Sequence, residues 1–204
     1  KRIALMGLWN VSNYGDPVLG LCTKKMLVDS ISLSEDVEFV EISLNPVLHI
    51  SGFQRIKDSI MYRFAKIMGN ASSADAKIIK RRFTKYYSGL LKNIDRVIFV
   101  GGGIVKYKLE FFDYIIESIM SIAQHDGIPV IMNAVGIEGY DENDERCLML
   151  KKSINGSALK YISTRDDFAL LKNKYLKGNG HVSCKLVADA AVWTSECFNI
   201  KKNT

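Results

Sequence analysis

Short runs of apolar residues recur along the chain and predict buried β-strands. They lie at residues 3–6, 37–42, 97–100, 130–133, 161–163 and 185–188. The runs are short and mostly continuous rather than alternating, which is typical of strands that are covered on both faces of a parallel sheet. We therefore expect one sheet with its strands parallel and helices on both sides.

Helical spacing of apolar residues fills most of the intervals between these strands. Asp and Pro favour helix starts, as N-cap and first helical residue, and Gly favours helix ends. We predict helices that begin with Asp16-Pro17, span 109–124 before His125-Asp126-Gly127, run from a cap at Asp141 to about Ile154, and run from a cap at Asp166 through Tyr175. This alternation predicts an α/β fold, a doubly wound parallel sheet in a single domain over residues 1–204.

Residues 53–93 interrupt this rhythm where one crossover helix is expected. Apolar positions predict two helices there, with a break at 69–73, so we interpret the segment as a helical insertion. It holds ten basic and two acidic residues, a net charge of +8 against +6 for the whole chain. A solvated helix pair is the ordinary interpretation of such a segment. The alternative is contact with anionic lipid at the inner face of a membrane, or with a lipid-linked acceptor.

The remaining composition excludes several classes of protein. No apolar run approaches the ~20 residues of a membrane span, and the first residues lack the features of a secretory signal. Four cysteines without Cys-x-x-Cys spacing and three histidines argue against a zinc site and a disulfide framework, so we expect no metal and a reducing cytoplasm. No motif that reads nucleic acid accompanies the basic segment, and we expect no nucleic-acid partner.

A glycine run ends one predicted strand. Gly101, Gly102 and Gly103 follow Val-Ile-Phe-Val, and bare backbone at the carboxyl end of a strand lets a ligand approach N–H groups closely. The run matches neither Gly-x-Gly-x-x-Gly nor a phosphate loop, so a dinucleotide or nucleoside triphosphate lacks its usual signature. A tight turn without a ligand is the alternative.

Three other clusters of glycine and polar residues follow predicted strands, and parallel strands bring such loops to one edge of the sheet. We expect substrate contacts from the candidates in these loops and the glycine run: Asn13, Gly15, Gly101, Gly102, Gly103, Asn133, Gly136 and Arg165. Arg165 offers a planar fork suited to a carboxylate or phosphate.

Two carboxylates in the same loops are candidate catalytic residues. Asp16 is a candidate general base, and Asp166 either has a catalytic role or orients Arg165. Each residue also has a structural interpretation, as the N-cap of its own helix. Asn133 either positions a hydroxyl or only closes its turn.

The ordered set of motifs resembles the polysaccharide pyruvyl transferases. The motifs are Asn-Tyr-Gly-Asp, Val-Ile-Phe-Val-Gly-Gly-Gly, Asn-Ala-Val-Gly-Ile, Ser-x-Arg-Asp and Ala-Asp-x-Ala-Val-Trp, between Ile3 and about Trp193. Ala190 departs from the family, which often has proline after that aspartate.

The resemblance implies a Rossmann-like N-terminal domain of a GT-B-like fold, with a second domain of similar size expected beyond this chain. It also implies transfer of pyruvate from phosphoenolpyruvate, as donor substrate and with no cofactor, to a glycan or lipid-linked sugar acceptor. The alternatives are a GT-B glycosyltransferase that uses a nucleotide sugar and a non-catalytic glycan-binding domain.

Overall fold

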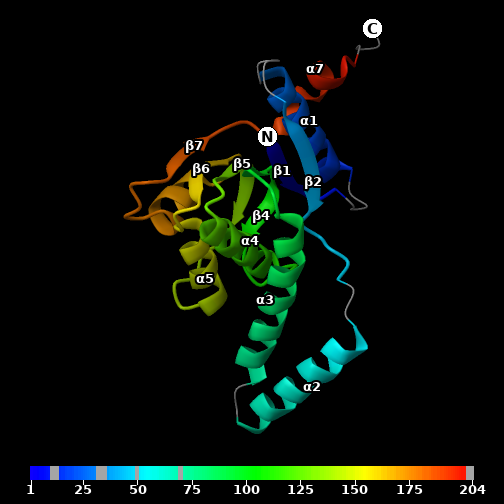
Figure 1. The fold of residues 1–204 in the computed structure, drawn as a ribbon. Helices are drawn as coiled ribbons and strands as arrows, with labels where there is room; N and C mark the ends of the chain where they lie inside the picture. Colours follow the sequence, from blue (N-terminus) through cyan, green and yellow to red (C-terminus); the bar gives the residue numbers. More distant parts are fainter. Residues whose placement is uncertain (10–13, 31–35, 49–50, 69–70, 201–204) are drawn as a thin grey trace.

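The computed structural model describes residues 1–9, 14–30, 36–48, 51–68 and 71–200. Within these residues, seven strands form a single sheet (Figure 1). They are β1 (Arg2–Gly7), β2 (Glu38–Ser43), β3 (Arg96–Phe99), β4 (Gly102–Lys106), β5 (Val130–Glu138), β6 (Leu159–Thr164) and β7 (Ser183–Leu186). Every predicted strand is present, and β4 is an additional strand that the apolar runs did not predict.

The strand order is β2-β1-β3-β5-β6-β7, and every pairing is parallel. β4 pairs only with the second half of β5. The chain moves outward in one direction from β1 to β2 and in the other direction from β3 onward. The carboxyl ends of β1 and β3 therefore flank the topological switch point, where ligands bind in open α/β sheets.

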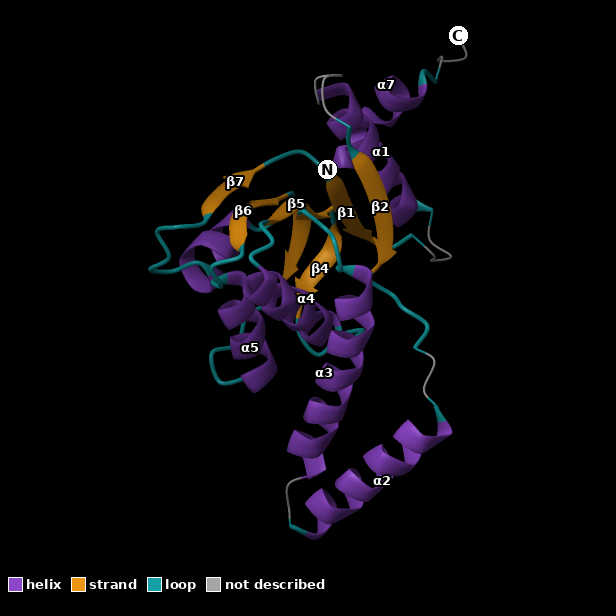
Figure 2. Ribbon diagram, in the orientation of Figure 1, coloured by secondary structure: helices purple, strands orange, loops and turns teal. Residues whose placement is uncertain are grey.

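Helices cover both faces of the sheet, which confirms the predicted doubly wound α/β class (Figure 2). On one face Leu5, Ile98 and Val100 pack with Trp9 and Leu27. The other face carries the larger core, where sheet residues pack against α3 (Ala71–Leu90), α4 (Phe112–Asp126) and α5 (Glu145–Ile154). The remaining helical segments are α1 (Gly15–Ser30), α2 (Gly52–Ile67), α6 (Phe168–Leu170), the π-helix η1 (Leu171–Tyr175), the 3-10 helix η2 (Ala190–Trp193) and α7 (Thr194–Phe198).

The predicted helices exist, but several of their caps are displaced. α1 begins at Gly15, so Asp16 lies in its first turn and is not its N-cap. Asp144, not Asp141, caps α5 and accepts hydrogen bonds from two backbone N–H groups. Asp167, not Asp166, caps α6. Gly127 ends α4 in the left-handed conformation with φ of 69°, as predicted.

Residues 53–93 form the predicted helix pair, α2 and α3. The second helix packs on the core through Ile78, Phe83 and Tyr87, which are buried. α2 instead lies outside the body of the molecule, beside the first half of α3 (Figure 1). The predicted break between the two helices, at residues 69–73, is confirmed only in part, because α3 already includes residues 71–73.

Within the described residues, none of the helices combines the length and apolarity needed to traverse a bilayer.

Candidate functional site

The glycine run lies at the carboxyl end of β3, beside the switch point, but it is not a simple loop. Gly101 has a φ of 106° and Gly102 has a φ of 86°, backbone angles that residues with a Cβ atom rarely adopt. This conformation turns the chain out of β3, and Gly102 then opens β4 and pairs with Val135. The two positive φ angles explain why glycine is needed here, whatever binds beside it.

Asn133 and Gly136 lie inside β5, which corrects the prediction that they belong to a loop after the strand. The register of β5 shifts between Met132 and Val135, and Ala134 has φ of 49°. This irregularity ends the pairing with β3 and begins the pairing with β4. The buried hydroxyl of Ser163 accepts from the Ala134 N–H at 2.9 Å and donates to Oδ1 of Asn133 at 3.3 Å. Asn133 therefore supports the kink in β5.

Gly136 of β5 lies close to β4 and to the residues that follow β6. A Cβ atom added at Gly136 would lie 3.0 Å from Oδ2 of Asp166 and 3.0 Å from Cα of Gly103. The glycine thus lets the Asp166 carboxylate and the backbone of β4 approach β5 closely. The predicted candidates Gly102, Gly103, Gly136 and Asp166 are brought together here.

The Asp166 carboxylate ties β6 to β5. Its Oδ1 accepts from the Ile137 N–H at 3.0 Å, from the Thr164 hydroxyl at 2.8 Å and from the Asp167 N–H at 2.7 Å. Three donors saturate that oxygen. The same bonds hold the carboxylate in one orientation, with Oδ2 directed to Gly136.

The start of α1 reaches the same cluster from the other side of the switch point. A Cβ atom at Gly102 would lie 3.6 Å from Oδ1 of Asp16, in the first turn of α1. Gly15 begins that helix, and the amino end of a 16-residue helix favours an anion. Asn13 lies outside the described residues.

Arg165 follows β6, and its side chain forms an ion pair with Asp189. The expectation that Asp166 orients Arg165 is therefore wrong, because Asp189 does so. Asp189 also accepts from the Ala191 N–H at 2.9 Å at the start of η2. The side chains of Arg165 and Asp189 are each 28% exposed. The Arg165 side chain is thus held by Asp189 and partly exposed.

Glu138 also lies at this edge, although it is not among the candidate residues predicted from the sequence. A Cβ atom at Gly103 would lie 3.0 Å from its Oε1, so this carboxylate lies against the glycine run. Its position directly after Gly136-Ile137 was the available signal, but the bulge that extends β5 to Glu138 cannot be seen in the apolar pattern.

The family model described as polysaccharide pyruvyl transferase matches residues 13–200, most of the chain. The chain belongs to this family. The match spans every element from α1 to α7, including the glycine run, Arg165 and the helix pair α2 and α3.

A search of curated proteins found none that matches this pyruvyl transferase family member. Among solved structures, the crystal structure of Arabidopsis thaliana UGT89C1 complexed with UDP-L-rhamnose is similar, with a TM-score of 0.43 and 9% sequence identity. The match covers 93% of this chain and 52% of that one, so this chain spans about half the length of UGT89C1. The doubly wound α/β class of this chain is shown by its own strand order and helix layers.

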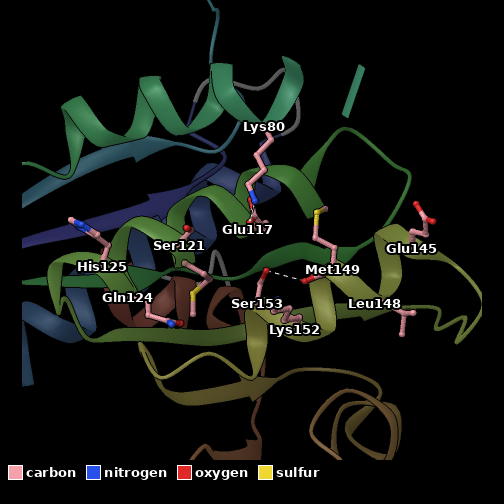
Figure 3. Close-up of a pocket in the computed structure, with 11 residues that line it drawn as sticks. Lys80, Glu117, Ser121, Gln124, His125, Glu145, Leu148, Met149, Lys152 and Ser153 are labelled. Carbon is pink, nitrogen blue, oxygen red and sulfur yellow. Dashed lines mark hydrogen bonds and ion pairs between the residues drawn. The ribbon is translucent and has the colours of Figure 1, made fainter. Parts of the chain in front are cut away.

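A groove of about 750 Å³ lies elsewhere on this family member, between α3, α4 and α5 (Figure 3). Lys80 of α3 reaches across to form an ion pair with Glu117 of α4. The other oxygen of Glu117 is buried and accepts no hydrogen bond from a described residue. The groove lies among the helices that cover one face of the sheet, and its lining contains none of the predicted candidates.

A metal centre has no counterpart in the described part of the chain, where no three His, Cys, Asp or Glu side chains gather closely enough to hold an ion.

Proposed function

We propose that the protein transfers pyruvate from phosphoenolpyruvate to a sugar of a surface or exopolysaccharide precursor, and that the product is a ketal. The observation that carries this proposal is the match of the pyruvyl transferase family over residues 13–200. The cluster at the switch point supports it, because a cation, a helix amino end and bare backbone lie along one edge of the sheet.

The chemistry of the donor defines what the site must supply. A proton added to the methylene carbon of phosphoenolpyruvate makes the adjacent carbon electrophilic. One sugar hydroxyl then attacks that carbon and gives up its proton to a base. Phosphate leaves, and a second hydroxyl of the same sugar attacks the same carbon and gives up its proton in turn, which closes the ketal. The route needs an acid, a base and groups that stabilise the carboxylate and phosphate.

Arg165 and the Gly101–Gly103 backbone are the proposed anion contacts. The Arg165 side chain is partly exposed, and Asp189 holds its guanidinium in place. The amino end of α1, with Gly15, is directed to the same edge. We also propose Asn13, Asn133 and Gly136 as substrate contacts, of which Asn133 and Gly136 lie in β5.

Asp16 and Asp166 are the proposed proton-transfer groups. Asp166 has one oxygen saturated by three donors, so only Oδ2 is available for chemistry. Asp16 lies close to Gly102, where a Cβ atom would be 3.6 Å from its Oδ1. Both carboxylates would then lie near a donor that rests on the glycine run.

The donor is a substrate, so the proposed reaction requires no resident cofactor. We propose that the acceptor is a glycan or lipid-linked sugar and that a second domain completes the donor site. We also propose that the protein acts in the cytoplasm.

The decisive experiment offers the full-length protein two classes of donor. Phosphoenolpyruvate and a panel of nucleotide sugars are incubated separately with a glycan acceptor, and the release of phosphate or nucleotide is followed. Acceptor-dependent release of phosphate from phosphoenolpyruvate supports the proposal. Release of nucleotide would assign a glycosyltransferase, and saturable glycan binding without release from either donor would assign a binding domain.

A further inference from the structure

α2 presents two different faces, and only one of them is covered. The face directed to α3 carries Asp58, which is 4% exposed and accepts from Gln54 of its own helix. Arg81 and Arg82 of α3 form ion pairs with the same carboxylate. These contacts fix which side of α2 is directed to α3, and so which side is directed to solvent.

The opposite face is an apolar stripe, by which we mean Phe53, Ile56, Ile60, Phe64 and Ile67. Their spacing of three or four residues places them along one side of a helix. Their exposed fractions are 80%, 61%, 51%, 65% and 83%. Large apolar side chains rarely gather at the surface without a partner, so a stripe of this length marks an interaction surface.

The charge of α2 selects the kind of partner. Arg55, Lys57, Arg63 and Lys66 are all exposed on the same helix. The acidic residue of α2 is Asp58, and it is buried and paired. Every charged side chain that α2 exposes to solvent is therefore basic. A second copy of this helix would bring four positive charges against four, whereas an anionic surface complements them.

The position of α2 follows from the topology. It comes after β2, and the carboxyl ends of all strands share one edge because every pairing is parallel. Figure 2 shows α2 and the first half of α3 extending beyond the sheet on the side toward which β2 points. The glycine run and Arg165 lie at that same edge.

We propose that α2 binds an anionic lipid membrane, with the apolar stripe immersed at the boundary of the acyl chains and the four basic side chains at the headgroup phosphates. A helix with a wide apolar face flanked by Lys and Arg lies in the plane of the interface. This contact would hold the carboxyl edge of the sheet near the membrane surface. It does not depend on pyruvyl transfer, and it explains why α2 carries an apolar face that the core does not use.

The test is flotation of the 204-residue chain with vesicles of phosphatidylcholine alone and with vesicles that also contain phosphatidylglycerol. We expect binding to the second kind only, weakened by salt. Two variants separate the two contributions, Ile60→Ser/Phe64→Ser in the stripe and Lys57→Gln/Arg63→Gln beside it. Each should lower the apparent affinity by at least about tenfold. Since these side chains are exposed, the variants should keep the wild-type circular dichroism and thermal unfolding.

Matched controls change exposed residues of the same kind elsewhere. Val28→Ser/Leu186→Ser removes apolar side chains from α1 and β7, and Lys172→Gln/Lys177→Gln removes two positive charges near η1. Both controls should float like the wild type. In addition, Phe64→Trp should give a tryptophan signal that brominated lipids quench more strongly than the signal of the wild type.

Three outcomes would overturn the proposal. The first is equal, negligible flotation with both kinds of vesicle. The second is loss of binding in the controls as large as in the α2 variants, which would indicate a non-specific charge effect. The third is a stripe-dependent dimer in solution, abolished by Ile60→Ser/Phe64→Ser, with no lipid binding, which would assign the stripe to a second copy.

Discussion

Asp166 lies against Gly136 so closely that the glycine has no room for a side chain on that side. A Cβ atom there would be 3.0 Å from Oδ2 of Asp166 and equally close to Cα of Gly103. The carboxylate is anchored by three hydrogen bonds, and Gly103 contributes backbone, so neither neighbour can yield easily. The junction of β4, β5 and β6 therefore depends on this glycine.

Gly136→Ala should destabilise the protein by about 1–3 kcal/mol, since overpacking forces backbone shifts. Urea unfolding followed by circular dichroism measures this. Gly89→Ala is the matched control, because a Cβ atom at this position in α3 meets nothing within 4 Å. It should stabilise the protein by about 0.5–1 kcal/mol, as alanine does inside a helix. Equal unfolding midpoints for Gly136→Ala and the wild type would show that the junction is not closely packed.

Two substitutions at Asp166 separate its structural and chemical roles. Asp166→Ala loses three accepted hydrogen bonds and should cost about 2–4 kcal/mol of stability. Asp166→Asn keeps an accepting oxygen for these donors and should unfold close to the wild type. If the carboxylate also transfers a proton, Asp166→Asn should lower the turnover of the full-length protein at least about a hundredfold. Full activity with normal stability would leave Asp166 a structural role alone.

The ion pair between Arg165 and Asp189 allows a similar separation. Arg165→Ala in the full-length protein should weaken the use of phosphoenolpyruvate at least about tenfold, or roughly 1.4 kcal/mol. Asp189→Asn retains the guanidinium and should affect donor use less. Lys160→Ala, which removes an exposed cation from β6, is the control and should have no effect. Unchanged use of phosphoenolpyruvate by Arg165→Ala would show that the guanidinium does not contact the donor.

The attachment of α2 to α3 should depend on pH through Asp58. Burial alone would raise the pKa of this carboxyl, but hydrogen bonds from Arg82 and Gln54 and the charges of Arg81 and Arg82 hold it below its ordinary 3.8. A pKa lowered by folding stabilises the contact above the ordinary value, and that contribution is lost as the pH falls through the folded value. Exchange of α2 backbone amides should therefore quicken, relative to β3, below about pH 4.

Asp58→Asn should produce the same faster exchange at neutral pH. We expect the free energy of opening of α2 to fall by about 1–3 kcal/mol. Glu142→Gln changes an exposed carboxylate and is the control. Equal α2 exchange in Asp58→Asn and the wild type would show that other contacts hold the helix.

The sequence predicted the strands and the helix layers well because both signals are local. The apolar run at 97–100, which predicts β3 (Arg96–Phe99), has no polar interruption, and the left-handed C-cap at Gly127 needs only a glycine in the right place. Cap identity was less predictable. Asp141, Asp144, Asp166 and Asp167 lie close to helix starts, and tertiary contacts decide which of them caps.

The sequence predicted where the glycine-rich edge lies, but not the strand pairing that forms it. The pattern indicated that Gly102 and Gly136 follow strands, but β4 and the second half of β5 form only because the bulge at Ala134 redirects the pairing. The partner of Arg165 was equally hidden, since Asp189 comes 24 positions later and meets it through the order of β6 and β7. Exposure of the apolar stripe was also not predictable, because helical spacing alone does not tell a buried face from an uncovered one.

The central claim is that phosphoenolpyruvate rests on the carboxyl edge of the sheet at the switch point. The most direct measurement is a nuclear magnetic resonance titration of the 15N-labelled chain with phosphoenolpyruvate, with inorganic phosphate as a reference ligand. The account predicts saturable shifts at the amides of Gly101, Gly102, Gly103 and Arg165, larger with phosphoenolpyruvate than with phosphate. Shifts confined to the groove around Lys80 and Glu117, with these four amides unmoved at saturation, would contradict it.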